Sequence, residues 1–455
     1  MDKPIRISYI GGGSRQWARN LMSDLALEPD LSGTVVLYDI DYEAATNNAI
    51  IGNMMMSLPE AKGKWDFVVA KTLEESLQEA DFVFISILPA TFEEMKAYVH
   101  IPEKWGVYQT VGDTVGPAGI FRALVMMPAY REFANAIKNI CPNAWVINFT
   151  NPMTMCVQIL YHLFPEVKTF GNCHEVFHVQ DIIARALKEK TGITASRKEI
   201  QINPLGINHF TWINYASYKN MDLMPIYKEF VNKYHQDGLG KDEWETYYPF
   251  GSGERVKFDL FKRSGVIAAA GDRHLVEFLP QSWYLKDKKM IHDWHFFLTP
   301  VDFRVNRWKE ANDASLRIIK KEEKIKIEPS GEEGILQLKA LLGLVDLTTN
   351  VNIINTGQIP NLPLGHVVET NALFRRDEVR PVYAGPMPDF SLGITQRHIQ
   401  NHKLLLKAFD EKDLSYARIA LEQDPLLEHL SIQDINDMFD EIALAIKPYL
   451  SYYIK

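Results

Sequence analysis

The sequence predicts an α/β protein in which a Rossmann-like doubly wound sheet is followed by an α+β part with antiparallel strands and helices. Three observations predict this fold. β-branched apolar runs alternate with amphipathic helical stretches up to about residue 195, a glycine-rich turn follows the first run, and strands close together in sequence appear after residue 199. We therefore expect two domains, residues 1–195 and residues 196–455.

The first part of the chain alternates strands with helices. Residues 5–10 predict a strand, three glycines predict a tight turn, and the spacing of Trp17, Leu21 and Leu25 predicts a helix. The later strands expected from apolar runs are residues 34–38, 81–87, 144–148 and 167–171. Alternation of this kind is typical of a parallel sheet, of which residues 167–171 would be the fifth strand.

The second part of the chain has a different pattern. Residues 199–223 alternate like antiparallel strands, residues 224–326 are aromatic-rich and mostly helical, and residues 347–382 contain strand-like runs. Helices are expected from about residue 395 onward. Because no linker rich in Gly, Ser or Pro separates the two parts, we expect them to be closely joined.

Composition narrows the class of partner and the compartment. The 455 residues include 49 Lys and Arg against 58 Asp and Glu, and this net charge of -9 argues against nucleic acid as the main partner. Three cysteines and the lack of a signal-peptide core indicate a reducing cytoplasm. Residues 140–164 carry no Asp, Glu, Lys or Arg, but their Asn and Pro residues predict strand, loop and helix rather than a membrane span.

The glycine turn predicts a dinucleotide site. Gly11 and Gly13 supply the G-x-G of the fingerprint, whereas Gln16 stands where its third glycine is expected. Asp39 ends the second strand, where an acid hydrogen-bonds the adenosine ribose and repels a 2′-phosphate. These residues, together with Gly12 and Ser14, predict NAD binding; the alternative is a purely structural turn.

Cys173 and His174 follow the strand at residues 167–171, at the sheet edge where such folds bind ligands. A thiolate there would bind a divalent metal or act as a nucleophile, and the alternative is a buried small hydrophobic residue. His209, in a strand-rich segment, would add a second ligand. Two protein ligands describe an open metal site that leaves positions for substrate oxygens.

Three polar segments with turn character complete the candidate site: residues 112–114, 148–152 and 271–274. Asn, Asp and Gly in turns often serve only as backbone caps. Together, however, the segments could surround a polyhydroxylated substrate. Arg273 could hold a carboxylate through a forked pair of hydrogen bonds.

The ordered motifs Ile10-Gly-Gly-Gly-Ser14, Asn148-x-Thr-Asn-Pro152, Cys173-His-Glu-Val176, Gly206-Ile-Asn-His-Phe210 and Gly271-Asp-Arg-His-Leu-x-Glu277 resemble those of the NAD-dependent glycoside hydrolases of family 4. The resemblance covers nearly the whole chain. The Cys-His-Glu-Val form is similar to that of the uronide-hydrolysing branch, the α-galacturonidases and α-glucuronidases. Of these two, the motifs favour α-galacturonide.

The resemblance implies a redox route to hydrolysis. In the family, NAD⁺ oxidises the sugar C3, which acidifies the C2 proton, and a divalent metal, commonly Mn²⁺, stabilises the enediolate. The aglycone then leaves from C1, water adds, and the NADH returns its hydride to C3. The implied substrate is a pectin-derived galacturonide, bound by a cytoplasmic homo-oligomer, a dimer or a tetramer.

The resemblance also assigns residues. Cys173 and His209 match the metal ligands, and Asn148 matches a residue near the nicotinamide. The residues expected against the substrate are Asn151, Arg273, His274 and Glu175.

The acid and base are assigned in the same way, with alternatives left open. His174 matches the proton donor of relatives, and Asp113 is a second candidate acid. Asp272 matches the C2 base of some branches, whereas other branches use a tyrosine.

The substrate charge follows from one departure from the family. Met95 stands where phosphoglycosidases carry an arginine, so a 6-phosphate would lack its anchor. A C6 carboxylate still needs a cation, for which Arg273 is the first candidate and Arg15 and Arg122 are weaker ones. The competing functions are an α-glucuronidase, an NAD-dependent hydroxy-acid dehydrogenase and a nucleotide-binding regulator without catalysis.

Overall fold

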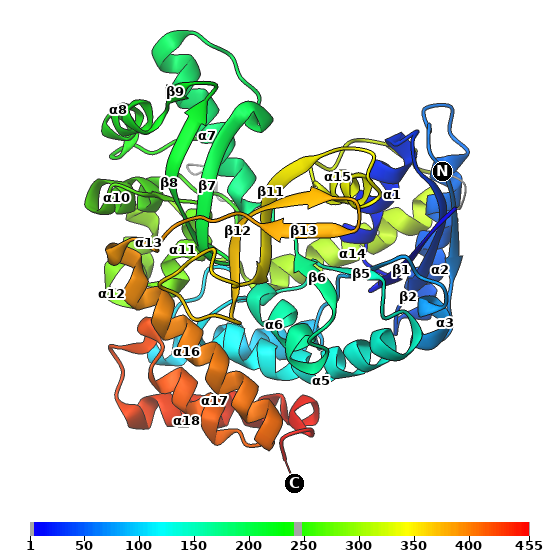
Figure 1. The fold of residues 1–455 in the computed structure, drawn as a ribbon. Coiled ribbons are helices and arrows are strands. Elements are labelled where there is room, and N and C mark those ends of the chain that lie inside the picture. The colour runs from blue at the N-terminus through cyan, green and yellow to red at the C-terminus, as the bar shows by residue number, and fades with distance from the viewer. Residues whose placement is uncertain (1–3, 241–247, 455) are drawn as a thin grey trace.

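A computed structural model describes residues 4–240 and 248–454 and places a single mixed sheet at the centre of the molecule (Figure 1). The first six strands pair in parallel in the order β3-β2-β1-β4-β5-β6. Their bounds are Ile5–Ile10 (β1), Ser32–Tyr38 (β2), Lys64–Val69 (β3), Phe82–Ile85 (β4), Trp145–Asn148 (β5) and Lys168–Gly171 (β6). This is the strand order of a doubly wound fold, with its switch point between β1 and β4.

Helices cover both faces of the parallel sheet because strand side chains alternate between the faces. Ile5, Ile7 and Tyr9 of β1 pack into one apolar core with α1, α2 and α15, whereas Ile10 belongs to the core built around α5 and α6. The helices of the first half are α1 (Trp17–Leu27), α2 (Tyr42–Met56), α3 (Leu73–Leu77), α4 (Phe92–His100), α5 (Gly116–Ile140), α6 (Met153–Leu163) and α7 (Glu175–Thr191).

The sheet continues into the second half through antiparallel strands. β6 pairs with β11, and β12, β7, β8 and β10 follow outward, while β13 pairs with β12 and β9 with β8. The bounds are Ile200–Ile207 (β7), Phe210–Tyr218 (β8), Met221–Asp222 (β9), Ile267–Ala268 (β10), Leu347–Ile354 (β11), Val367–Arg375 (β12) and Glu378–Pro381 (β13). A domain division near residue 195 would fall between α7 and β7, but the sheet crosses it, and the division stays a prediction.

The remaining helices surround the antiparallel strands. They are α8 (Met224–Tyr234), α10 (Arg255–Ser264), α11 (Asp272–Leu275), α12 (Gln281–Tyr284), α13 (Lys288–Asp293), α14 (Val301–Ile319), α15 (Gly334–Leu341), α16 (Asp389–Glu411), α17 (Ser415–Glu422) and α18 (Ile432–Ala445). Short 3₁₀ turns lie at Ile101–Trp105, Arg197–Glu199, Val276–Phe278, Pro425–Leu427 and Lys447–Leu450. The last helices lie together and pack α16 and α17 against α5 (Figure 1).

The predicted fold class is confirmed, with two corrections. The strand Lys64–Val69 was not expected, so Gly171 ends the sixth strand rather than the fifth. This edge strand alternates exposed and buried residues and includes Lys64 and Asp66, which hid it among polar residues. The final helices begin at Asp389 rather than near residue 395, because Pro388 stands in extended conformation directly before the first turn.

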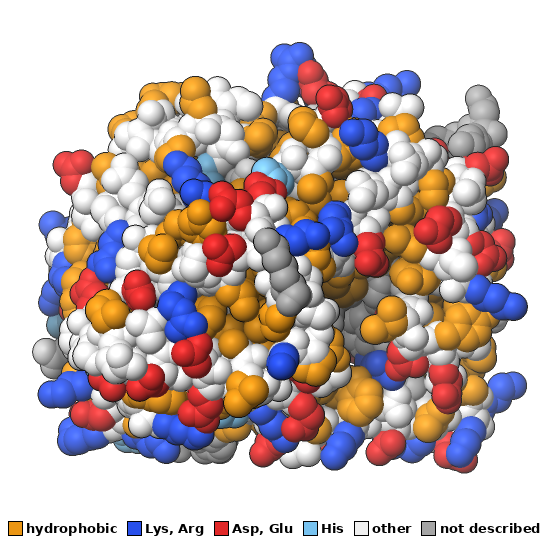
Figure 2. Space-filling view, turned by 90° about the horizontal axis from the view of Figure 1, so that it is seen from below, with side chains coloured by type: hydrophobic (Ala, Val, Ile, Leu, Met, Phe, Trp, Pro, Cys, Tyr) orange, Lys and Arg blue, Asp and Glu red, His pale blue; other side chains and the backbone are white. Residues whose placement is uncertain are grey.

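The uncharged stretch at residues 140–164 forms the end of α5, then β5 and α6, as expected. In the described part of the chain, we find no helix that is both long and apolar enough to cross a bilayer. On the face shown in Figure 2, acidic and basic side chains are intermixed with apolar ones.

Candidate active site

The glycine turn lies at the carboxyl end of β1, against the ends of β2 and β4. Gly11 has φ +94°, and a Cβ there would lie 2.0 Å from the carbonyl oxygen of Ser86. A Cβ at Gly12 would lie 2.6 Å from the Cβ of Leu37. Larger residues would therefore push the turn outward, so glycine is required for its close approach to the sheet. The Ser14 hydroxyl accepts a hydrogen bond from the N–H of Trp17, the first residue of α1.

Asp39 lies directly against this turn. Its Oδ2 accepts a hydrogen bond from the N–H of Gly13 at 2.8 Å, and its Oδ1 accepts one from the N–H of Asp41. Burial raises the pKa of Asp39. The turn and the acid thus stand together, as a site for pyrophosphate and ribose requires.

The structure brings Cys173 and His209 together. Cys173 follows β6, His209 occupies the tight turn between β7 and β8, and their Sγ and Nε2 atoms lie 3.4 Å apart. Burial raises the pKa of Cys173 well above its usual value and, with the nearby His274, lowers the pKa of His209 to about 4. His209 is therefore neutral near pH 7, the form in which imidazole binds metals.

Thr114 decides which nitrogen of His209 is free. Its hydroxyl has a single hydrogen, which it donates to Oδ1 of Asp113 at 2.6 Å. The contact of 2.8 Å between the Thr114 oxygen and Nδ1 of His209 must then carry the imidazole hydrogen. The lone pair of His209 consequently lies on Nε2, on the side of Cys173, as a metal ligand needs.

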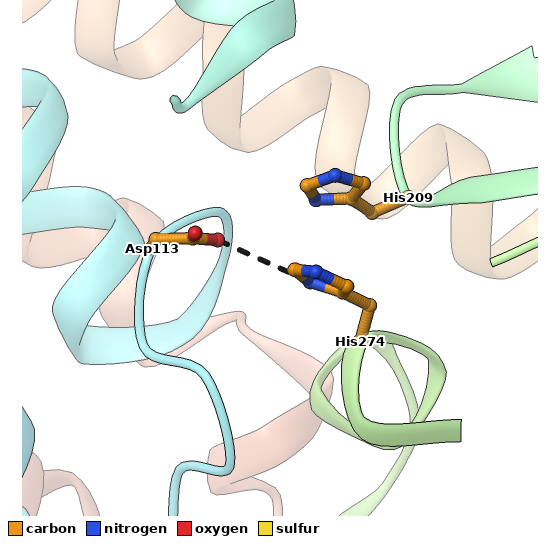
Figure 3. A group of neighbouring side chains, drawn as sticks. All are labelled: Asp113, His209 and His274. Atoms are coloured by element: carbon orange, nitrogen blue, oxygen red, sulfur yellow. Dashed lines mark ion pairs between the residues drawn. The ribbon is translucent and has the colours of Figure 1, made fainter. Parts of the chain in front are cut away.

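Asp113, His209 and His274 form a cluster whose ligand atoms lie within 4.8 Å of one another (Figure 3). The two imidazole rings stack with centroids 3.7 Å apart, and Nδ1 of His274 faces Oδ1 of Asp113 at 4.0 Å. Burial opposes ionisation of Asp113, but the charges of His274, His209 and Arg122 outweigh it and hold its pKa well below the usual range. Asp113 is thus an ionised carboxylate, as a hydrogen-bond acceptor or ligand requires.

Asn151 and Glu175 border this cluster. Nδ2 of Asn151 donates to Oδ2 of Asp113 at 3.3 Å, while its buried Oδ1 has no hydrogen-bond partner among the described residues. Glu175 accepts a hydrogen bond from the N–H of Gly271 and lies 3.7 Å from Nε2 of His274. Burial alone would raise the pKa of Glu175, but the neighbouring histidines outweigh burial and lower the pKa to about 2. Asn151 thus lies against Asp113 and Glu175 lies near His274, which stacks on His209, so that five of the predicted residues form one group.

His174 is half-exposed and directly follows Cys173. Its Nδ1 lies 3.1 Å from Oε1 of Glu332, and its ring lies 5.8 Å from that of Trp17. Burial lowers the pKa of His174, but the hydrogen bond and the charge of Glu332 outweigh burial and raise it. The imidazole is accordingly favoured in its protonated form, which a proton donor needs.

Asp272 points elsewhere. Its two carboxylate oxygens accept hydrogen bonds from the N–H groups of Val256 and Lys257, at 3.0 and 2.9 Å, at the beginning of α10. Burial, helped by the charge of Glu254, raises its pKa to about 7. The side chain of His274, two residues later, instead faces Asp113. The assignment of Asp272 as the C2 base stays a prediction.

Arg273 is held inside the protein. Its Nη2 donates to the carbonyl of Thr110 and to the hydroxyl of Thr299, and its guanidinium lies 5.1 Å from the ring centre of Phe250. The buried Nε has no hydrogen-bond partner in the described part of the chain. Burial, with the charge of Arg304, lowers its pKa to about 10, so it stays cationic at neutral pH.

The two weaker candidates for binding the C6 carboxylate, Arg122 and Arg15, are engaged in other contacts. Arg122 donates to the carbonyl of Asn151, and Arg15 pairs with Asp41 and stacks on Trp308.

The side chain of Asn148, the residue expected near the nicotinamide, is fully buried, where it donates to the carbonyl of Thr150. Asn148 thus shapes the turn after β5 from inside.

Sequence reasoning missed several residues of this region: Thr114 as the partner of His209, Glu277, Arg304 and Glu332. Glu277 accepts hydrogen bonds from Thr110, Val111 and Gly112, and so fixes the loop that carries Asp113. Thr114 lies in the polar segment of residues 112–114, and Glu277 ends the motif that begins at Gly271, so these two segments were the available signal. Arg304 and Glu332 lie in a helix and a loop without any such motif.

Comparison with known proteins identifies the chain by sequence. The pattern of the Family 4 glycosyl hydrolases matches residues 6–189, and that of the Family 4 glycosyl hydrolase C-terminal domain matches residues 205–427. An alpha-galacturonidase of Thermoanaerobacterium saccharolyticum is 54% identical over 98% of this chain and 96% of its own length.

Solved structures show the same architecture. A Bacillus subtilis protein described as a glucosidase, 45% identical, superimposes with a TM-score of 0.92 over 96% of this chain and 99% of its own. A 6-phospho-alpha-glucosidase from gut microorganisms, solved with NAD and Mn²⁺, is 20% identical and superimposes with a TM-score of 0.81 over 98% of this chain and 99% of its own. The second likeness is one of fold.

Proposed function

The chain belongs to family 4 of the glycosyl hydrolases and is a glycosidase; from this premise we propose that it releases galacturonic acid from α-galacturonides, using NAD and a divalent metal such as Mn²⁺. The observation that carries the proposal is the pair of Cys173 and His209, 3.4 Å apart, beside an ionised Asp113. Its identity of 54% to an alpha-galacturonidase supports the substrate.

The residues present fit both groups. The turn at Gly11 to Gly13 with Asp39 would hold the dinucleotide, since the glycines let the turn lie close against the sheet and the Asp39 carboxylate stands beside it. Cys173 and His209 would hold the metal, because a thiolate and a neutral imidazole suit a borderline divalent ion. When bound, NAD supplies reversible hydride acceptance and the metal supplies electrostatic stabilisation of developing oxygen anions.

The chain's own side chains would then move protons and orient the sugar. We assign His174, whose pKa is raised, as the proton donor to the leaving oxygen, because the other candidate acid, Asp113, is held in its ionised form and has no proton to donate. Asn151, Glu175 and His274 would hydrogen-bond sugar hydroxyls, because they border the metal pair. Asp272 is the proposed base, and its pKa of about 7 suits proton abstraction near neutral pH.

The C6 carboxylate would be read by buried guanidinium groups. The guanidinium groups of Arg273 and Arg304 both lie over the ring of Phe250. The buried Nε of each lacks a hydrogen-bond partner within the described ranges. A desolvated cation strongly favours an anionic partner over a neutral hydroxymethyl group. Preference for a uronide over a neutral galactoside follows.

The test is an assay of 4-nitrophenyl α-galacturonide and α-glucuronide with NAD⁺, Mn²⁺ and a thiol reductant, repeated in D₂O. We expect release from the galacturonide, no net NADH, and deuterium at C2 of the sugar. Faster release from the glucuronide would point to an α-glucuronidase instead. Stoichiometric NADH from a hydroxy acid would point to a dehydrogenase, and no C2 deuterium would refute the redox route. The cytoplasmic location and the dimeric or tetrameric state stay predictions.

A further inference from the structure

Glu332 is a buried carboxylate for which the mechanism above has no role. Its side chain is only 13% exposed, and Oε1 lies 3.1 Å from Nδ1 of His174. The other oxygen, Oε2, is buried and has no hydrogen-bond partner in the described segments. A carboxylate desolvated in this way is costly unless a cation or a donor compensates it, and here the compensating group is His174.

The loop that carries Glu332 is fixed on both sides. The N–H of Ser330 donates to Oδ1 of Asp24 in α1 at 2.8 Å, and the N–H of Glu332 donates to the hydroxyl of Ser330. On the other side, Glu333 pairs with Arg197 at 3.1 Å. Glu332 is therefore held in place by the backbone of a tethered loop.

The imidazole of His174 is also held from another direction. Trp17, the first residue of α1, lies with its ring 5.8 Å from that of His174 at an angle of 36°. Trp17 in turn packs at 6.0 Å on Phe149, in the turn after β5. One aromatic ring and one carboxylate thus set the plane of the imidazole and keep a hydrogen on its Nδ1.

We propose that Glu332 is the positioning residue of the proton donor: its carboxylate accepts the Nδ1 hydrogen of His174 and presents Nε2–H to the glycosidic oxygen. This inference rests on the proposed function. The electron pair left on C2 by deprotonation forms the double bond between C1 and C2 as the bond from C1 to that oxygen breaks. The electron pair of the broken bond stays on the oxygen, which takes the proton from Nε2. His174 is left neutral, with its hydrogen on Nδ1 still donated to Glu332.

Leaving-group dependence distinguishes this role from a structural one. A nitrophenolate leaves without help, whereas the alkoxide of α-1,4-digalacturonate needs the proton. Loss of an outer partner typically costs about 10–100-fold, so we expect Glu332→Gln to lose this much kcat on digalacturonate and less than about 3-fold on 4-nitrophenyl α-galacturonide. Similar losses on both substrates would overturn the proposal, as would no loss on either.

Isotope exchange gives a second readout. In D₂O, Glu332→Gln should accumulate deuterium at C2 of unreacted digalacturonate, because C2 deprotonation persists while departure of the aglycone slows. Absence of that excess over wild type would overturn the proposal. NAD⁺ affinity, measured by fluorescence titration, should be unchanged; a loss of affinity without a change in the leaving-group ratio would assign Glu332 to cofactor binding instead.

The matched control is Glu333→Gln, which removes the neighbouring buried carboxylate that pairs with Arg197. It should lower thermal stability but keep the wild-type ratio between the two substrates. If Glu332→Gln does not fold, Glu332→Asp gives the same comparison with the charge retained but withdrawn from Nδ1. If the wild-type enzyme is inactive on both galacturonides, the proposed function is refuted. If the wild-type enzyme is active and the variant keeps the same ratio of activities on the two substrates, only the role of Glu332 is refuted.

Discussion

The free energy of unfolding of the Glu277→Gln variant, relative to that of wild type, should increase as the pH rises. Glu277 is 1% exposed, and one oxygen accepts hydrogen bonds from the N–H groups of Val111 and Gly112 and from the hydroxyl of Thr110. Burial, together with the charge of Asp113, raises its pKa from 4.5 to about 7. Its second oxygen is buried without a hydrogen-bond partner among the described residues, where a proton or an amide group would sit.

The magnitude follows from proton linkage. The folded protein keeps the Glu277 proton up to about pH 7, whereas the unfolded chain loses it near pH 4.5, so stability falls as the pH rises between these values. At about 1.4 kcal/mol per pH unit, the total is roughly 3 kcal/mol, of which about 2 kcal/mol falls between pH 5.5 and 8.5. Glutamine keeps the accepting oxygen and does not titrate, so its own cost is an offset of about 1 kcal/mol at every pH.

The assay is denaturant unfolding of wild type and Glu277→Gln at several pH values. The free energy of unfolding of the variant minus that of wild type should rise by about 2 kcal/mol from pH 5.5 to 8.5. The control, Glu60→Gln, replaces an exposed glutamate and should give a profile parallel to that of wild type. Parallel profiles for Glu277→Gln would refute the reasoning, because Glu277 would then be ionised in the folded protein at neutral pH.

Three further predictions concern the site. Cys173→Ser should lower Mn²⁺ affinity in calorimetric titrations by more than about 100-fold, which exceeds the loss expected for a residue that only hydrogen-bonds to a metal ligand. NAD⁺ affinity should stay within about 3-fold of wild type, and unchanged Mn²⁺ affinity would contradict the role of Cys173 as a ligand. Arg273→Ala should reduce the kcat/KM ratio of α-galacturonide to α-galactoside by about 10-fold or more, whereas Arg131→Ala, which removes a guanidinium stacked on Tyr452, should not; equal ratios would contradict carboxylate binding. Asp272→Asn should suppress C2 exchange more than hydride transfer to NAD⁺, since an amide cannot take the proton; unaffected exchange would assign the base to another residue.

The sequence by itself determined the parallel half of the fold and the local parts of the site. Apolar runs of strand length and helical spacing predicted the β1-α1-β2 unit, because side-chain alternation follows directly from backbone geometry. Gly13 and Asp39 were expected together since neighbouring parallel strands end at the same sheet edge, and their hydrogen bond of 2.8 Å agrees with that expectation. The short edge strand Lys64–Val69 escaped prediction because half of its residues face solvent.

Only the tertiary structure decided how the side chains of the site meet. The hydroxyl of Thr114 sets the free nitrogen of His209, Glu332 reaches His174 from a loop anchored on α1, and Asp272 turns toward α10 rather than toward Asp113. The contacts of His209 and His174 join segments far apart in the chain, and all of these contacts depend on how loops, hairpin and short helices pack at one sheet edge. Hydrophobic periodicity records which face of an element is buried, but it does not record the partners of individual polar atoms, which packing alone brings within hydrogen-bond distance.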